Sequence, residues 1–273
     1  MAFNRASNPL TYTTLNVGHE RQILDEFERR LIPDLNHEDN GWRAPRTPEE
    51  LDIYYELFAV TAAQDLFIVQ STALGFGVTE DADLHLLLTR QIADDGRHAS
   101  YMRESVQALT GRDPIDEIQR NVKRQWEIVG DLPRQGFLGW MAFEIEYELY
   151  AVPEIVVALR TQKIIDPRLV EWGPEGGADE AFHREFITAW WRRYLSQRTP
   201  SVRQEIVGRM LEYDREYRER KASYYRNLID RMASLGAWNY EQVKVITDSW
   251  HRELRDYLFS QPGLSSNHTT AQE

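Results

Sequence analysis

Two segments of the chain carry the same pattern of two acids, two other residues and a histidine. They are Asp94-Asp95-Gly96-Arg97-His98 and Asp179-Glu180-Ala181-Phe182-His183. In each segment the second acid and the histidine are three positions apart. Residues at this spacing lie on one face of an α-helix, about a turn apart, so both side chains can reach one metal ion. The repeated pattern therefore predicts two helices that meet at a metal site.

The composition limits which ligands and partners are possible. The chain has 273 residues and no cysteine, so every metal ligand must be a histidine or a carboxylate, a set that suits iron or manganese better than calcium or magnesium. The net charge of −12 disfavours nucleic acid and anionic membranes as partners. The most apolar stretch, around Leu57–Gly77, is broken by Gln64, Asp65 and Gln70, so we expect no membrane-spanning helix. The N-terminus lacks the apolar core of a signal peptide, and we expect a cytoplasmic protein.

Start and stop signals predict an all-α fold, a ferritin-like four-helix bundle with flanking helices. Thr47-Pro48-Glu49-Glu50 is a strong helix start, Thr79 is the expected cap of the next helix, and Gly173–Gly177 is the expected loop before the second histidine helix. We expect an N-terminal arm over 1–46, one helical domain over 47–260 and a flexible tail over 261–273. The expected helices cover 20–31, 48–74, 80–109, 115–128, 135–161 with a kink at Pro153, 178–196, 200–234 and 239–259.

A di-metal bundle needs one inward carboxylate on the helix that precedes each histidine motif. Asp65 lies 30 positions before Asp95 in a mostly apolar helix. Glu146 lies 34 positions before Glu180, and Glu144 and Glu148 compete with it for this role. An antiparallel pair of long helices gives such separations when the two side chains meet at mid-height. The predicted metal-ligating and catalytic residues are Asp65, Asp95, His98, Glu146, Glu180 and His183.

These motifs resemble those of the ferritin-like di-iron carboxylate oxygenases, in particular the bacterial multicomponent monooxygenases that hydroxylate toluene, phenol and methane. The chain departs from the usual motif at Asp95, where glutamate is common, and at Phe182, where arginine is common. The resemblance implies that one metal is held by Asp65, Asp95 and His98, and the other by Glu146, Glu180 and His183. It also implies that Asp95 and Glu180 bridge the metals.

By the same resemblance, Asp94 and Asp179 accept hydrogen bonds from the outer nitrogens of the two histidines. The expected cofactor is a pair of iron ions, Fe/Fe or Mn/Fe, and the expected activity is O₂-dependent hydroxylation of a small organic substrate with an external reductase as electron donor. Three alternatives stay open: a Mn/Fe ligand-binding oxidase, an amine N-oxygenase, and a non-catalytic partner subunit of such an enzyme. A homodimer is expected because symmetric dimers are the commonest oligomers.

Overall fold

The described part of the chain is built from helices. The structure is a computed structural model, and it describes residues 15–32, 41–151, 162–221, 224, 230–231, 233–234 and 240–260. Within these ranges a single backbone bridge, between Arg43 and Ile164, is the one element of β-structure, so the all-α prediction is confirmed. The first part of the predicted arm, the predicted kink at Pro153 and the predicted tail lie outside the described residues.

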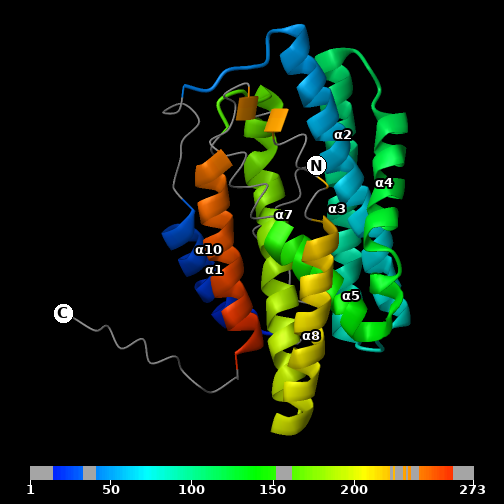
Figure 1. Cartoon of the computed structure of the whole chain (residues 1–273), viewed down its shortest axis with the longest axis vertical. Coiled ribbons are helices and arrows are strands. Elements are labelled where there is room, and N and C mark those ends of the chain that lie inside the picture. The colour runs from blue at the N-terminus through cyan, green and yellow to red at the C-terminus, as the bar shows by residue number, and fades with distance from the viewer. Residues whose placement is uncertain are drawn as a thin grey trace, which may run out of the picture.

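The helices form a layered bundle (Figure 1). The helices α2 (Pro48–Thr72), α3 (Ala82–Thr110) and α4 (Ile115–Val129) lie side by side, and α2 packs along both of the others. The helices α5 (Gly136–Glu144), α7 (Pro167–Ser196) and α8 (Pro200–Lys221) run through the middle, and α1 (Gly18–Leu31) and α10 (Tyr240–Phe259) pair on the far side. Short 3₁₀ turns at Ala73–Gly77 and Leu132–Arg134 follow α2 and α4.

The start of α2 follows from its first four residues. The Thr47 hydroxyl accepts a hydrogen bond from the Glu50 N–H, and the Glu50 carboxylate accepts one from the Thr47 N–H, both at 3.2 Å. This reciprocal pair satisfies two donors that a helix start would otherwise leave free, so the predicted capping box is confirmed. The predicted cap of α3 was wrong by two residues: Asp81 accepts from the Leu84 N–H, while the Thr79 hydroxyl accepts from the Asp81 N–H.

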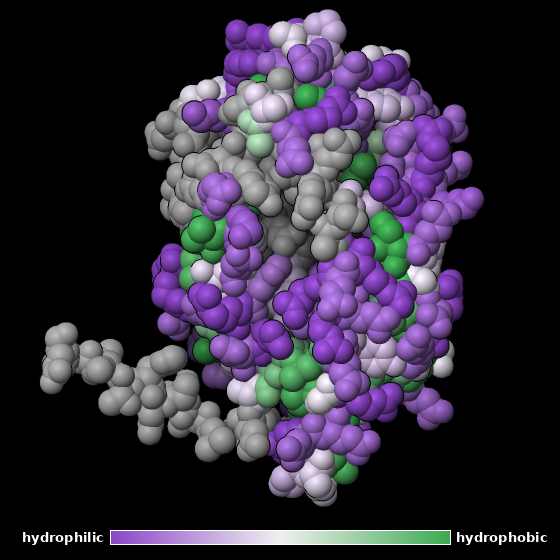
Figure 2. Space-filling model, viewed as in Figure 1, coloured by the Kyte–Doolittle hydropathy of each residue, from purple (hydrophilic) through white to green (hydrophobic). Residues whose placement is uncertain are grey.

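Helix α2 is the core helix of this side of the bundle. By length and hydropathy the segment Pro48–Gly77 could cross a membrane, contrary to the expectation that no helix is apolar enough to do so. Half of its apolar window is buried within the protein, and Ala59, Ala62 and Phe67 have no exposed surface. An apolar helix packed on several sides has the composition of a core helix. Figure 2 shows that the viewed outer face is mainly hydrophilic, with apolar side chains in small separate groups.

Helix α7 runs without a break through the segment that was predicted to be a loop. It spans Pro167–Ser196 and contains Pro174, so the predicted loop at Gly173–Gly177 was wrong. Proline removes one hydrogen bond but does not prevent a helix that tertiary packing holds in place. Gly176 is buried against the indole of Trp172, and a Cβ there would lie 2.3 Å from the ring. Trp172 and Gly176 therefore lie on the same continuous helix as the second histidine motif.

A π-helix, Ile145–Ala151 (η3), continues α5. Side chains of α10 contact its carbonyl groups: the Trp250 indole N–H donates to the Leu149 carbonyl at 2.9 Å, and Nε2 of His251 lies 3.3 Å from the Tyr150 carbonyl. Such partners compensate for the looser backbone hydrogen bonding of a π-helix, which is often found at functional sites. The predicted single α-helix over 135–161 is therefore replaced by an α-helix and a π-helix in its described part.

Candidate metal centre

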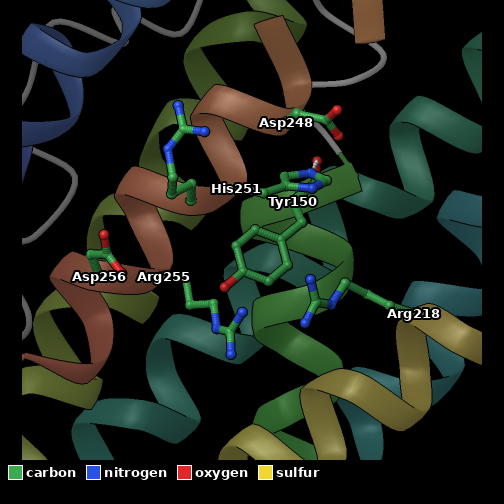
Figure 3. A pocket seen from close by; sticks show the side chains of 7 residues that line it. Tyr150, Arg218, Asp248, His251, Arg255 and Asp256 are labelled. Atoms are coloured by element: carbon green, nitrogen blue, oxygen red, sulfur yellow. Dashed lines mark hydrogen bonds between the residues drawn. The ribbon is translucent and has the colours of Figure 1, made fainter. Parts of the chain in front are cut away.

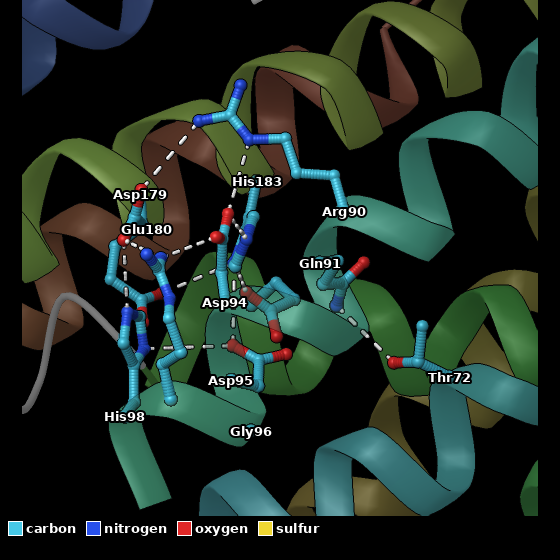
Figure 4. Close-up of polar contacts among 12 residues, drawn as sticks. Thr72, Arg90, Gln91, Asp94, Asp95, Gly96, His98, Asp179, Glu180 and His183 are labelled. Atoms are coloured by element: carbon cyan, nitrogen blue, oxygen red, sulfur yellow. Dashed lines mark hydrogen bonds and ion pairs between the residues drawn. The ribbon is translucent and has the colours of Figure 1, made fainter. Parts of the chain in front are cut away.

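The two motif histidines present their Nδ1 atoms to the same two carboxylates (Figure 4). Nδ1 of His98 lies 3.1 Å from Oε1 of Glu180 and 3.9 Å from Oδ1 of Asp95. Nδ1 of His183 lies 3.8 Å from Oε2 of Glu180 and 3.7 Å from the same Oδ1 of Asp95. Each of these two acids therefore faces both histidines, which is the placement that a bridging carboxylate requires.

A third carboxylate reaches the cluster from η3. Oε2 of Glu148 lies 3.2 Å from Nδ1 of His183, and Glu148 is fully buried. Two groups of residues bring ligand atoms within 4.8 Å of one another: Asp95 with His98 and Glu180, and Asp95 with Glu148 and His183. Asp95 belongs to both groups, so the cluster offers two adjoining cation positions.

The structure does not bring Glu146, the residue predicted for the lone-carboxylate position, into this cluster. Oε1 of Glu146 lies 3.3 Å from Nζ of Lys221 on α8. Two residues span roughly half a turn of a helix, so Glu146 and Glu148 necessarily point in different directions. Glu144, one turn before Glu148, accepts hydrogen bonds from Thr72 and Gln91, both at 2.9 Å.

The outer nitrogens of the histidines are paired across the two motifs. Nε2 of His98 lies 3.4 Å from Oδ2 of Asp179, and Nε2 of His183 lies 3.4 Å from Oδ2 of Asp94. Each histidine thus meets the first acid of the other motif, on the other helix. A carboxylate at the outer nitrogen fixes the ring orientation and leaves Nδ1 free to bind a metal.

Two arginines of α3 hold these outer acids. One amino group of Arg97 lies 2.6 Å from Asp94 and 2.8 Å from Asp179. Arg90 approaches the same acids, with Nε at 3.2 Å from Asp94 and an amino group at 3.7 Å from Asp179 (Figure 4). Burial opposes ionisation of Asp94, but the contacts with His183 and the arginines outweigh it and lower its pKa. Asp94 therefore remains a charged acceptor.

Asp65 lies on α2 within the electrostatic field of the cluster. Burial is the main reason that its pKa rises to about 8, and the charges of His98, Glu180 and Glu148 act on it as well. Its side chain is nearly buried, so a cation beside it would replace the lost solvation. Of the six predicted site residues, the structure thus groups Asp95, His98, Glu180 and His183 directly and keeps Asp65 adjacent.

Burial and charge together determine the protonation of the cluster. Burial and the neighbouring Glu148 and Glu180 raise the pKa of Asp95 well above its ordinary value. For both histidines burial acts to lower the pKa, but contacts with carboxylates outweigh it, so His98 reaches about 10 and His183 about 9. The protein alone therefore holds extra protons here, and these are the protons that a divalent cation displaces from its ligands.

Aromatic side chains flank both histidines of the cluster. The rings of Trp172 and His98 meet edge to face with centroids 5.0 Å apart, and Trp172 stacks on Tyr101 at the same separation. Phe182 and Phe186 lie 6.1 and 6.3 Å from the His183 ring. Trp172 is not among the residues predicted for the site, because it directly precedes the expected loop in the sequence, whereas in the structure it lies one helical turn before Gly176.

In comparisons with known proteins, no protein-family model, no curated protein and no solved structure matches this chain.

Proposed function

We propose that this chain is a ferritin-like di-metal carboxylate protein that uses O₂ to oxidise a small organic substrate. One observation carries the proposal. Two histidines present their inner nitrogens to the same pair of carboxylates, Asp95 and Glu180, while their outer nitrogens are held by the first acid of the opposite motif. The inner nitrogens and the two shared carboxylates therefore face one another, which supports two adjoining cation positions.

The unpaired oxygens of the cluster fit such a metal pair. Oδ2 of Asp95, Oε1 of Glu148 and Oε2 of Glu180 are buried and have no hydrogen-bond partner among the described residues. Buried polar atoms without partners are costly, and bound cations would satisfy them. With Asp65 the cluster holds four carboxylates, whose charge two divalent cations would balance. Mixed carboxylate and imidazole ligands favour iron or manganese.

The proposal assigns the metal ligands to two sets of residues. Asp65, Asp95 and His98 would hold one metal. Glu148, Glu180 and His183 would hold the other, with Asp95 and Glu180 shared. When bound, two iron ions supply electrons to O₂ and so allow oxidation of an unactivated substrate.

Substrate hydroxylation consumes one O₂, two electrons and two protons, and it yields one water with the oxygenated product. The proposal therefore includes an external electron donor. Asp94 and Asp179 would keep the histidine rings fixed throughout the reaction, and Trp172 and Phe186 would exclude water from the reacting centre.

Metal content tests the proposal directly. We expect about two iron ions, or one manganese and one iron, per chain in protein from iron-supplemented cells, measured by inductively coupled plasma mass spectrometry. His98→Ala and Glu180→Ala should lose both metals and keep their helix content, measured by circular dichroism. Fe²⁺-loaded wild-type protein should consume O₂ with a reductant, and the two variants should not.

Two outcomes would overturn the proposal. The first is less than about a tenth of a metal per chain after anaerobic reconstitution with Fe²⁺, which would indicate a partner subunit without metal. The second is full occupancy in both variants, which would place the metals elsewhere in the chain.

A further inference from the structure

A second polar site lies on the side of η3 that faces away from the metal cluster. Tyr150 follows Glu148 by two residues, roughly half a helical turn, so the two side chains point in different directions. Tyr150 lines a cleft of about 280 Å³ between η3, the end of α8 and α10. Arg218 of α8 and His251, Arg252 and Arg255 of α10 line the same cleft (Figure 3).

The floor of this cleft holds a hydroxyl group without a partner. Tyr150 is only 2% exposed, and its hydroxyl oxygen is buried with no hydrogen bond among the described residues. Its ring packs against His251, with centroids 4.8 Å apart. The hydroxyl points away from His251 and toward the guanidinium group of Arg255 (Figure 3). A phenol is protonated at neutral pH, so this group is a hydrogen-bond donor that the described residues leave unused.

The two guanidinium groups beside the hydroxyl share one carboxylate. Arg218 donates to Oδ2 of Asp214 at 2.7 Å, and Nε of Arg255 lies 3.9 Å from the same oxygen. Asp214 is itself buried, and it meets the cleft through these two arginines. Two positive charges and one negative charge leave an excess of one positive charge next to an unused O–H donor. One acceptor group with a single negative charge would complete this set.

The other charged groups of the cleft do not cancel this excess. Asp248 is exposed and lies 3.7 Å from Nζ of Lys244, and Asp256 is exposed. Burial lowers the pKa of His251 to about 4, so the ring is neutral and adds no charge. Arg252 contributes a further cation at the rim, where it donates to the Ser249 hydroxyl at 3.3 Å. Lys244 and Arg252 thus offset Asp248 and Asp256 at the rim, and the excess of one positive charge stays beside the Tyr150 hydroxyl, where it favours a small anion.

We propose that this cleft is a binding site for a small organic carboxylate, held by Arg218 and Arg255 and by a hydrogen bond from Tyr150. A planar carboxylate matches the fork of a guanidinium group, and its single charge matches the local excess. The cleft volume leaves room for an organic body of several heavy atoms behind the carboxylate. The proposal does not depend on metal binding, because neither Tyr150 nor the arginines belong to the metal cluster.

Calorimetric titration of the full-length protein with sodium benzoate tests this site. Inorganic phosphate serves as a second probe, and sodium chloride keeps the ionic strength constant. We expect saturable benzoate binding that Arg255→Gln and Tyr150→Phe each weaken about tenfold or more. The matched control is Tyr147→Phe, which removes a buried hydroxyl from the same π-helix. That hydroxyl donates to Gln125 at 3.2 Å and does not line the cleft, so benzoate binding should be unchanged.

Thermal unfolding supplies an independent readout. Without benzoate, Tyr150→Phe should unfold at the wild-type temperature, because its hydroxyl has no partner within the described protein to lose. With benzoate, the wild-type protein and Tyr147→Phe should gain stability, and Tyr150→Phe should gain much less.

Four results would overturn the proposal. The first is no saturable binding of benzoate, and the second is benzoate binding in Tyr150→Phe and Arg255→Gln that is as tight as in wild type. The third is tighter binding of phosphate than of benzoate, and the fourth is loss of benzoate binding in His98→Ala. The last result would mean that the carboxylate binds at the metals. Retained benzoate binding in His98→Ala, with loss in Arg255→Gln, supports a separate site even if the metal proposal fails.

Discussion

Nε2 of His98 lies 3.4 Å from Oδ2 of Asp179, an acid 81 residues further along the chain. The reciprocal contact joins His183 to Asp94 at the same distance. Each histidine is therefore oriented by the helix that carries the other histidine. The two halves of the cluster are consequently interdependent, because a change that moves α7 relative to α3 disturbs both rings.

The first prediction concerns the carboxylate from η3. Glu148→Ala should lower the metal content to below about half of wild type, because the proposed ligand beside His183 is removed. Glu146→Ala is the matched control, since its carboxylate pairs with Lys221. It should keep the wild-type metal content. Equal loss in both variants, measured by mass spectrometry of the metals, would contradict this assignment.

The outer acids provide the second prediction. Asp179→Asn should weaken metal affinity about 10–100-fold, because the amide no longer fixes the orientation of His98 as an anion does. Arg97→Gln should give a smaller loss in the same direction, through both outer acids. Arg103→Gln removes an exposed ion pair with Asp113 from the same helix and should leave the affinity unchanged. Competition with a chelator measures the affinities, and an Arg103→Gln effect as large as that of Asp179→Asn would refute the positioning role.

The third prediction compares two adjacent glycines of α7. Gly176→Ala places a Cβ 2.3 Å from the Trp172 ring and should destabilise the fold by about 1–3 kcal/mol. It should also displace Trp172 from His98. Gly177→Ala meets no atom within 4 Å and should stabilise the helix by about 0.5–1 kcal/mol. Urea unfolding of the two variants measures these changes. An unchanged free energy of unfolding in Gly176→Ala would show that the Trp172 indole moves aside without cost.

The fourth prediction concerns acid stability at the start of α2. The pKa of Glu50 is lowered to about 2, mainly by hydrogen bonds from the Arg43 side chain. Burial acts to raise this pKa, and hydrogen bonds from the N–H groups of Arg46 and Thr47 lower it further. The unfolded chain takes up this proton near pH 4.5 and the folded protein only near pH 2. Stability from Glu50 is therefore fully present above about pH 4.5 and falls as the pH decreases toward 2.

Glu50→Gln makes this contribution measurable. Wild type should exceed the variant in urea midpoint at pH 6, and the difference should shrink steadily between pH 4.5 and pH 2. If the difference in urea midpoint stays constant over this interval, the negative charge of Glu50 does not contribute to stability.

The sequence predicted local features well because they depend on close neighbours. The capping box at Thr47 and the shared face of Asp95 and His98 both follow from helical spacing alone. The repeated motif also predicted that the two histidine helices would meet at one site, and the family resemblance implied that Asp95 and Glu180 lie between them.

The errors arose where a choice depended on partners from distant segments. Three glutamates alternate over 144–148, and helical spacing places Glu144 and Glu148 on one face but does not say which face turns inward. That choice depends on Lys221 of α8, which pairs with Glu146. The glycine-rich stretch 173–177 has the composition of a loop, yet Trp172 packs against Gly176 and the segment is helical.

The π-helical turn also has an evolutionary consequence. A π-helix is commonly viewed as an α-helix with one inserted residue, and each residue of an α-helix turns the chain by about 100°. Deletion of one residue before Glu148 would rotate Glu148 away from His183 and Tyr150 away from the arginines in the same event. The side-chain directions at the two sites therefore depend on the same register of this helix. A lineage could change either site by substitution, but an insertion or deletion in this segment would alter both at once.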